Sequence, residues 1–202
     1  TNAWDFQQYE NRHLWYSTTF DSPTAGDANT YLVFNGIDTV ADIYLNGTFL
    51  GHTENMLIAH EFQVSGLKPT GNELLVQIHP ATVYARRYEI KPMHTASIYG
   101  TSSLPLRKVP SMYGWDIMPR FVSGGIWKSV TLVQKPAERL EQFYLYTEKT
   151  NPARNNAAVA AFFQIQTKRD TLKGLKIVMD AVCGDSRVHT ENDVWHTFGT
   201  LR

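Results

Sequence analysis

Short apolar runs separated by glycine, proline and asparagine dominate the first two-thirds of the chain. Several runs have the length and the β-branched content that strands favour, and some alternate polar with apolar residues as half-buried strands do. They lie at 31–34, 39–45, 61–64, 73–79 and 126–133. Asn46-Gly47 follows the second run and Thr48–Leu50 begins a return strand. Both turn residues tolerate positive φ, so the pair predicts a tight β-hairpin.

The strand pattern stops between Pro80 and Pro119. Residues 81–88 are compatible with one or two helical turns. Residues 91–112 carry three prolines and several serines, which predicts a long ordered loop. Loops of this length without regular structure are uncommon and are usually functional. This loop leads directly into the segment 114–120.

Lys135-Pro136 predicts a domain boundary, because a strand pattern restarts after it. The later strands are expected at 140–147, 157–167, 175–182 and 193–198. Such spacing is typical of an immunoglobulin-like sandwich, which needs roughly 100 residues when complete. We therefore predict an all-β chain whose first domain covers residues 1–135. A small or truncated immunoglobulin-like β-sandwich follows over 137–202.

Charge and composition give no support for two classes of partner. Lys plus Arg and Asp plus Glu both number 19, so the formal net charge is zero. This balance gives no support for nucleic acid or an anionic membrane as a partner. No apolar run is long enough to span a bilayer. The chain opens at Thr1 without an initiator methionine, which we interpret as a mature form or an excised piece of a longer protein.

Metal and cofactor chemistry also lack support. The single cysteine, Cys183, forms no C-x-x-C motif, and the histidines show no ligand spacing such as H-E-x-x-H. No nucleophile motif of the G-x-S-x-G type is present. His52, His60 and His79 lie near the ends of expected strands, where structural roles are the simplest interpretation. We therefore expect neither a cofactor nor a metal.

The segment 114–127 carries the candidate chemistry, beginning with Trp115 and Asp116. A flat aromatic ring beside a short acid is suited to a sugar, because the ring stacks on C–H groups and the acid accepts hydrogen bonds from hydroxyls. The alternatives are an ordinary loop acid for Asp116 and a core role for Trp115. Trp127 begins an expected strand, which favours the core.

Three basic residues are candidates for supporting this segment. Arg120 follows Pro119 and is suited to a bidentate pair with a carboxylate, which would orient Asp116 or the loop. Arg107 and Lys108 either anchor the long loop or are solvated charges.

An ordered set of motifs resembles the amino-terminal sugar-binding domain of family 2 glycoside hydrolases, most closely the β-mannosidase branch. The resemblance runs from about Trp15 to Val133. Its motifs are Trp15–Phe20, Phe34–Gly47, Asn55-Met56, Gly71–Leu74, Arg107-Lys108, Gly114–Asp116, Pro119-Arg120 and Gly125–Trp127.

This resemblance implies a multidomain enzyme that removes terminal sugars with retention. In that family a β-jelly-roll domain and an immunoglobulin-like domain precede a (β/α)8 barrel that holds two catalytic Glu residues. The resemblance therefore implies that residues 1–135 form a jelly-roll sandwich, like a galactose-binding domain. No Glu of this chain corresponds to either, so we expect no catalytic residue here and no hydrolysis by this chain alone. In members of that family, the Asp at the position of Asp116 reaches into the barrel's active site and binds hydroxyls of the terminal sugar. The expected partners are therefore a carbohydrate substrate and the missing barrel, and the family's habits imply a periplasmic or secreted setting.

One departure keeps the sugar open. The β-mannosidase pattern reads Trp-Asp-Trp-Gly-Pro-Arg, whereas Ile117 and Met118 stand here in place of the second Trp and the Gly. A β-galactosidase or β-glucuronidase relative is therefore also compatible. Two other functions remain as alternatives: a stand-alone carbohydrate-binding module, and a structural scaffold that braces the barrel.

Overall fold

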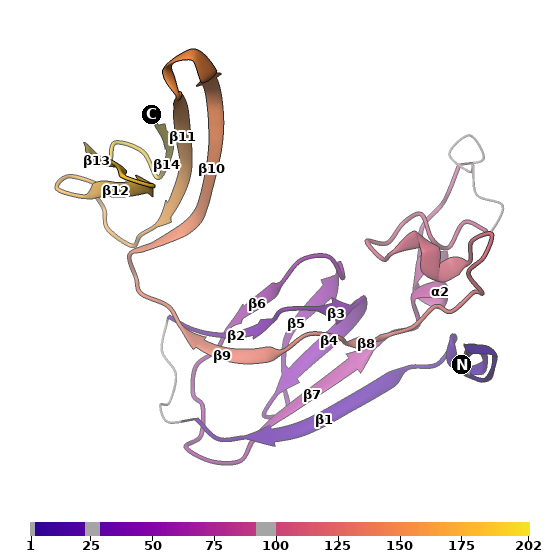
Figure 1. Ribbon diagram of the computed structural model, residues 1–202. Coiled ribbons are helices and arrows are strands. Elements are labelled where there is room, and N and C mark those ends of the chain that lie inside the picture. Colours follow the sequence, from indigo (N-terminus) through magenta and orange to yellow (C-terminus); the bar gives the residue numbers. More distant parts are fainter. Residues whose placement is uncertain (1–2, 23–28, 92–99) are drawn as a thin grey trace. The chain divides into compact units, whose positions relative to one another are not determined.

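The computed structural model describes residues 3–22, 29–91 and 100–202. It divides into two compact units, Thr1–Gln134 and Lys135–Arg202, which are coloured indigo to salmon and orange to yellow in Figure 1. Strands are the predominant regular structure among the described residues of both units, which confirms the all-β prediction. Residues 92–99 of the predicted long loop, including Pro92, lie outside the described residues.

A four-stranded antiparallel sheet forms one layer of the first unit, in the order β1-β7-β4-β5. Its strands are β1 (Leu14–Phe20), β7 (Asn72–Ile78), β4 (Val40–Leu45) and β5 (Thr48–Glu54). Alternate residues of the central strands are buried, and Ala41, Ile43 and Val76 are among those that face the main core. This period of two is the signature of a sheet with one covered face.

A three-stranded sheet in the order β6-β2-β9 contributes the other side of this core. Its strands are β6 (His60–Gln63), β2 (Thr30–Phe34) and β9 (Val130–Gln134). A short pair joins β3 (Ile37–Asp38) to β8 (Gly125–Ile126). The single strand predicted over 126–133 is therefore interrupted, because the amides of Trp127 and Lys128 both donate to the Gly36 carbonyl instead of continuing a ladder.

The predicted hairpin is present. Asn46 and Gly47 have φ values of 50° and 79° and connect β4 to β5. Beside the turn, Asn72 is buried: its side chain accepts from the Lys68 amide and donates to the carbonyls of Phe20 and Lys68. One buried amide thus ties the turn before β7 to the end of β1.

The described residues 80–91 and 100–113 leave the sheets and form a cap. It contains α2 (Ala81–Tyr84), η2 (Ala85–Arg87) and η4 (Pro110–Tyr113), and the first two confirm the helical turns expected at 81–88. A second apolar cluster lies beneath the cap, formed by Val40, Ala81, Ala85, Leu106, Tyr113 and Val122. The segment before β1 forms α1 (Ala3–Phe6) and η1 (Gln7–Tyr9), which the sequence pattern did not reveal.

The second unit holds two small sheets, in the orders β10-β11-β14 and β12-β13. Its elements are β10 (Arg139–Asn151), η5 (Pro152–Arg154), β11 (Asn156–Gln166), β12 (Lys176–Cys183), β13 (Ser186–Asp193) and β14 (Phe198–Leu201). The strand predicted at 193–198 is wrong, since most of that range connects β13 to β14. The missed signal was Gly184-Asp185, a two-residue hairpin turn with Gly184 at φ 58°. The immunoglobulin-like assignment stays a prediction.

Candidate functional site

Trp115 and Asp116 lie on one tight turn. The amide of Trp115 donates to the Met118 carbonyl at 3.1 Å and the amide of Met118 donates back at 3.1 Å, which places Asp116 and Ile117 at the tip. We call residues 115–118 the Trp-Asp turn. Trp115 is 61% exposed and Ile117 is 92% exposed, and Asp116 is also exposed. A large aromatic and an acid are therefore presented together at the surface.

Arg120 supports the base of this turn. Its guanidinium forms a bidentate pair with the Glu10 carboxylate, with Nε 3.0 Å from Oε2 and Nη2 bonded to Oε1. Nη1 also donates to the Tyr113 carbonyl at 3.4 Å. The predicted pairing of Arg120 with a carboxylate is thus present in the structure, and its partner comes from the N-terminal segment.

Lys108 and Arg107 have opposite environments despite being neighbours. The Lys108 ammonium is buried and lies 2.5 and 2.6 Å from the two carboxylate oxygens of Asp38, and it also donates to the Ser123 carbonyl at 2.6 Å. Burial lowers the pKa of Lys108, although the charge of Asp38 and its hydrogen bond act in the opposite direction. Arg107 is exposed, and its backbone carbonyl accepts from the Met56 amide at 3.0 Å. The loop is therefore anchored by the side chain of one residue and by the backbone of the other.

Tyr113 lies in sequence between Lys108 and Arg120. Its ring is buried in the apolar cluster beneath the cap, and the Arg120 guanidinium stands 5.4 Å from the ring centroid. Its hydroxyl is buried without a hydrogen-bond partner among the described residues. Burial, reinforced by the charge of Asp38, raises the pKa of Tyr113 to about 12, so this hydroxyl stays protonated at neutral pH.

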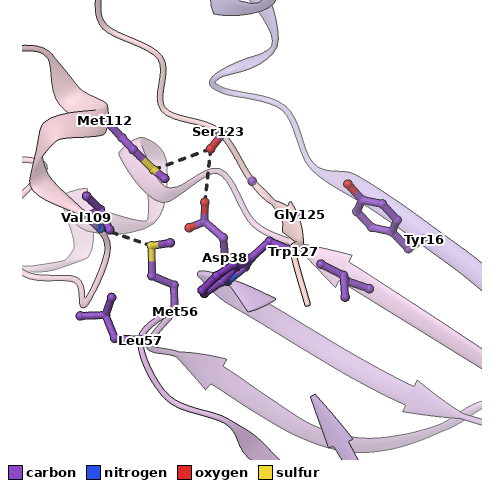
Figure 2. Close-up of a pocket in the computed structure, with 11 residues that line it drawn as sticks. Tyr16, Asp38, Met56, Leu57, Val109, Met112, Ser123, Gly125 and Trp127 are labelled. Carbon is purple, nitrogen blue, oxygen red and sulfur yellow. Dashed lines mark hydrogen bonds between the residues drawn. The ribbon is translucent and has the colours of Figure 1, made fainter. Parts of the chain in front are cut away.

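A pocket of about 410 Å³ opens beside the Asp38–Lys108 pair. Figure 2 shows the thioethers of Met56 and Met112 near Asp38. Tyr16 and Trp127 also line the pocket. Trp127 is 50% exposed, so the core role predicted for it is wrong: its indole lies against Gly36, where the absence of a Cβ leaves room for the ring.

The lining of this pocket is mainly apolar. Its carboxylate, Asp38, is already neutralised by Lys108, and Ser123 lies within 3.4 Å of the same carboxylate. Such a lining favours an apolar or aromatic occupant over a charged one. Trp115 and Asp116 are not among the described residues that line it.

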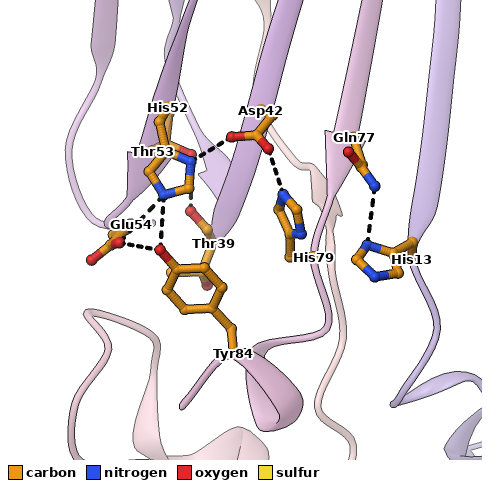
Figure 3. A network of polar contacts seen from close by, with 9 residues as sticks. All are labelled: His13, Thr39, Asp42, His52, Thr53, Glu54, Gln77, His79 and Tyr84. Carbon is orange, nitrogen blue, oxygen red and sulfur yellow. Dashed lines mark hydrogen bonds and ion pairs between the residues drawn. The ribbon is translucent and has the colours of Figure 1, made fainter. Parts of the chain in front are cut away.

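A polar network occupies the outer side of the four-stranded sheet (Figure 3). Asp42 lies between two histidines, with His52 Nδ1 at 2.6 Å and His79 Nε2 at 2.8 Å from its oxygens. Burial acts to raise the pKa of Asp42, but the hydrogen bonds from the two histidines outweigh it and lower the pKa. Asp42 is therefore a stable anion at neutral pH.

Glu54 is the second carboxylate of this network. It accepts hydrogen bonds from the hydroxyls of Tyr84 at 2.6 Å and Tyr88 at 3.0 Å. The bond from Tyr84, chiefly, lowers the pKa of Glu54, and the same bond raises the pKa of Tyr84 to about 12. Because both tyrosines belong to the cap, Glu54 fastens the cap to the end of β5. His52 and His79 are both paired with Asp42, and His60 contacts the Asn55 carbonyl, so the three histidines near strand ends have structural partners.

The structure gathers the predicted site residues into two places. Trp115, Asp116 and Arg120 form the Trp-Asp turn and its support, whereas Lys108 lies beneath the loop. Sequence reasoning missed two carboxylates, Glu10 and Asp38. Asp38 falls within the motif Phe34–Gly47, which was a usable signal, but nothing local marks Glu10.

The described ranges contain neither a metal-binding cluster nor a helix that could span a membrane. Among these residues no group of three or more His, Cys, Asp or Glu is arranged to hold a metal ion. In the same part of the chain, every helix is too short or too polar to cross a membrane.

Comparison with curated proteins finds β-mannosidases. β-Mannosidase B of Thermothelomyces thermophilus is 32% identical over 139 residues, which cover 65% of this chain and 16% of that protein. Mouse β-mannosidase is 31% identical over 130 residues, covering 58% of this chain and 15% of its own length. The chain thus spans about a sixth of the length of these relatives.

Solved structures agree with this relationship. The β-D-mannosidase of Dictyoglomus thermophilum matches 99% of this chain and 25% of its own, with 26% identity and a TM-score of 0.80. A β-glucuronidase from Bifidobacterium dentium, at 18% identity and a TM-score of 0.59, shares the fold. Residues 1–128 match the family model described as glycosyl hydrolase 2 galactose-binding domain-like. The chain therefore belongs to the glycosyl hydrolase 2 galactose-binding domain-like family and is related there to β-mannosidases.

Proposed function

We propose that this chain is the non-catalytic, substrate-facing N-terminal portion of a retaining exo-β-glycosidase, with β-mannosidase as the first candidate activity. In this proposal Asp116 accepts hydrogen bonds from hydroxyls of the terminal sugar and Trp115 lies against its ring. The catalytic carboxylates belong to a barrel in the remainder of the enzyme. Several matching relatives are β-mannosidases, which supports the choice of mannoside.

The observation that carries this proposal is the exposed Trp-Asp turn on a supported base. Trp115 is 61% exposed and the neighbouring Asp116 is exposed as well, so a ring face and a carboxylate are both accessible to a sugar. Bonds made by Arg120 and by the buried Lys108 restrain the residues on both sides of the turn. A preorganised aromatic and acceptor suit a site that binds a sugar without first reorganising.

The test is steady-state kinetics of the full-length protein with Asp116→Ala and Asp116→Asn. A charged hydrogen bond contributes about 1.5–3 kcal/mol, so kcat/KM should fall roughly 10- to 100-fold for each bond lost. Aryl β-mannoside, β-galactoside and β-glucuronide, assayed in parallel, identify the sugar. Asp185→Ala, an exposed acid in the β12–β13 turn, is the matched control and should leave kcat/KM unchanged. An unchanged kcat/KM for Asp116→Ala would rule out the sugar contact.

The same turn supports one alternative, a stand-alone carbohydrate-binding module, since exposed aromatic rings are the platform that such modules use. Calorimetry of the 202-residue chain with mannose and manno-oligosaccharides separates the two. Tight binding by this chain alone favours the module. Absence of binding, together with activity of the full-length protein, favours the enzyme portion. A scaffold that only braces the barrel predicts that Asp116→Ala lowers stability and leaves kcat/KM intact.

A further inference from the structure

The N-terminal segment closes onto the chain immediately after the Trp-Asp turn. Gln7 Nε2 donates to the Arg120 carbonyl at 2.6 Å, and the rings of Phe6 and Phe121 meet edge to face with centroids 6.1 Å apart. The Glu10–Arg120 pair adds a third contact, across 110 positions of sequence. A hydrogen bond to a backbone carbonyl, a ring contact and an ion pair therefore hold the N-terminal segment against Arg120 and Phe121.

Arg120 connects both ends of the Trp-Asp turn. It follows the turn in sequence, yet its guanidinium donates to the carbonyl of Tyr113, which precedes the turn. The guanidinium also lies over the Tyr113 ring, 5.4 Å from its centroid. The orientation of this planar group therefore influences the separation of the two ends of the turn.

Glu10 restrains that orientation through its bidentate pair with the guanidinium. Its side chain is 12% exposed against 35% for Arg120, so the carboxylate is the better enclosed partner. A bidentate pair restrains the guanidinium in its plane, which a single hydrogen bond does not. Gln at this position would keep one acceptor but lose the charge and the second acceptor.

We propose that Glu10 is a positioning residue for the sugar-contacting turn. It holds Arg120, and Arg120 holds the two ends of the Trp-Asp turn, so a carboxylate of the N-terminal segment sets where Trp115 and Asp116 meet the sugar. This inference rests on the proposed function. Glu10 touches no substrate, and its effect passes entirely through Arg120.

The first readout is the rate of amide hydrogen exchange in the Trp-Asp turn. Amide hydrogen exchange of the full-length protein reports on the Trp115 and Met118 amides, which bond across the turn. Glu10→Gln should accelerate exchange of these two amides about tenfold, because a charged hydrogen bond that limits local opening is lost. Glu141→Gln is the matched control: it disturbs an Arg–Glu pair with Arg139 in the second unit and should leave the turn unchanged.

The second readout is a kinetic cycle with Asp116→Ala. Glu10→Gln alone should lower kcat/KM about five- to tenfold, since a small displacement of a binding group is costly in catalysis. In the Asp116→Ala background the same change should have little further effect, because the group that Glu10 positions is gone. Arg120→Lys, which keeps the charge and loses the fork, should resemble Glu10→Gln.

The outcomes separate the two proposals. Unchanged exchange at the turn in Glu10→Gln overturns the positioning role. A loss in kcat/KM that persists fully in the Asp116→Ala background also overturns it, while the sugar contact of Asp116 stands. Faster exchange at the turn, combined with an Asp116→Ala variant of normal kcat/KM, instead overturns the proposed function. A urea denaturation midpoint for Glu10→Gln close to that of Glu141→Gln excludes general unfolding as the cause.

Discussion

Replacing Lys108 with methionine tests what holds the long loop on the sheet. The substitution keeps most of the aliphatic stem and removes the ammonium group. The side chains of Lys108 and Asp38 are 1% and 5% exposed, so the change leaves a carboxylate that is almost fully enclosed. The Ser123 carbonyl loses its donor from Nζ at the same time.

The expected magnitude follows from the groups that remain. Breaking a buried pair by removing one partner costs about 3–5 kcal/mol. Asp38 still accepts from the hydroxyls of Thr39 and Ser123, so we expect the lower end of this range, about 3 kcal/mol. This loss corresponds to a fall in melting temperature of roughly 10 °C for a unit of this size.

Urea denaturation followed by tryptophan fluorescence measures the loss. Four of the tryptophans belong to the first unit, and Trp195 belongs to the second. A Trp195→Phe background therefore restricts the signal to the unit that contains the pair. The double variant Asp38→Asn, Lys108→Met should lose less than the two single variants together, because it leaves no unpaired charge.

Arg107→Met is the matched control, because it removes a neighbouring positive charge that is exposed. Its effect should stay within about 0.5 kcal/mol. A loss of less than about 1 kcal/mol for Lys108→Met, or an equal loss for Arg107→Met, would refute the reasoning that the buried pair anchors the loop.

Two further predictions concern the tyrosines and the acid that hold the cap. Tyr113→Phe removes a buried hydroxyl that has no partner among the described residues, so the free energy of unfolding should stay constant or rise by about 1 kcal/mol. A clear fall in the urea midpoint would show that the hydroxyl makes a hydrogen bond in the folded protein. The bond from Tyr84 lowers the pKa of Glu54 below its ordinary value of 4.5, so the stability that Glu54 contributes is present above that pH and is lost as the pH falls through the lowered pKa. Urea midpoints between about pH 6 and pH 3.5 should therefore decline less in Glu54→Gln than in the wild type, and parallel declines would contradict this linkage.

Local chemistry in the sequence was sufficient for much of the fold. Asn46-Gly47 predicted its hairpin because positive φ is a property of the turn residues themselves. The alternation along β4 and β7 predicted strands because burial of one sheet face imposes a period of two. The motifs from Trp15 to Trp127 were enough to identify the family, and the Trp-Asp pair was visible within them.

Only the tertiary structure decided which charges matter. Arg107 and Lys108 are adjacent and chemically similar, yet one is exposed and the other is buried against Asp38, which lies 70 positions away. Glu10 likewise acquires its role from Arg120, and no local pattern links the two. Such pairs depend on how distant segments meet on the sheets, and periodicity along the chain carries no information about which distant residues will be neighbours.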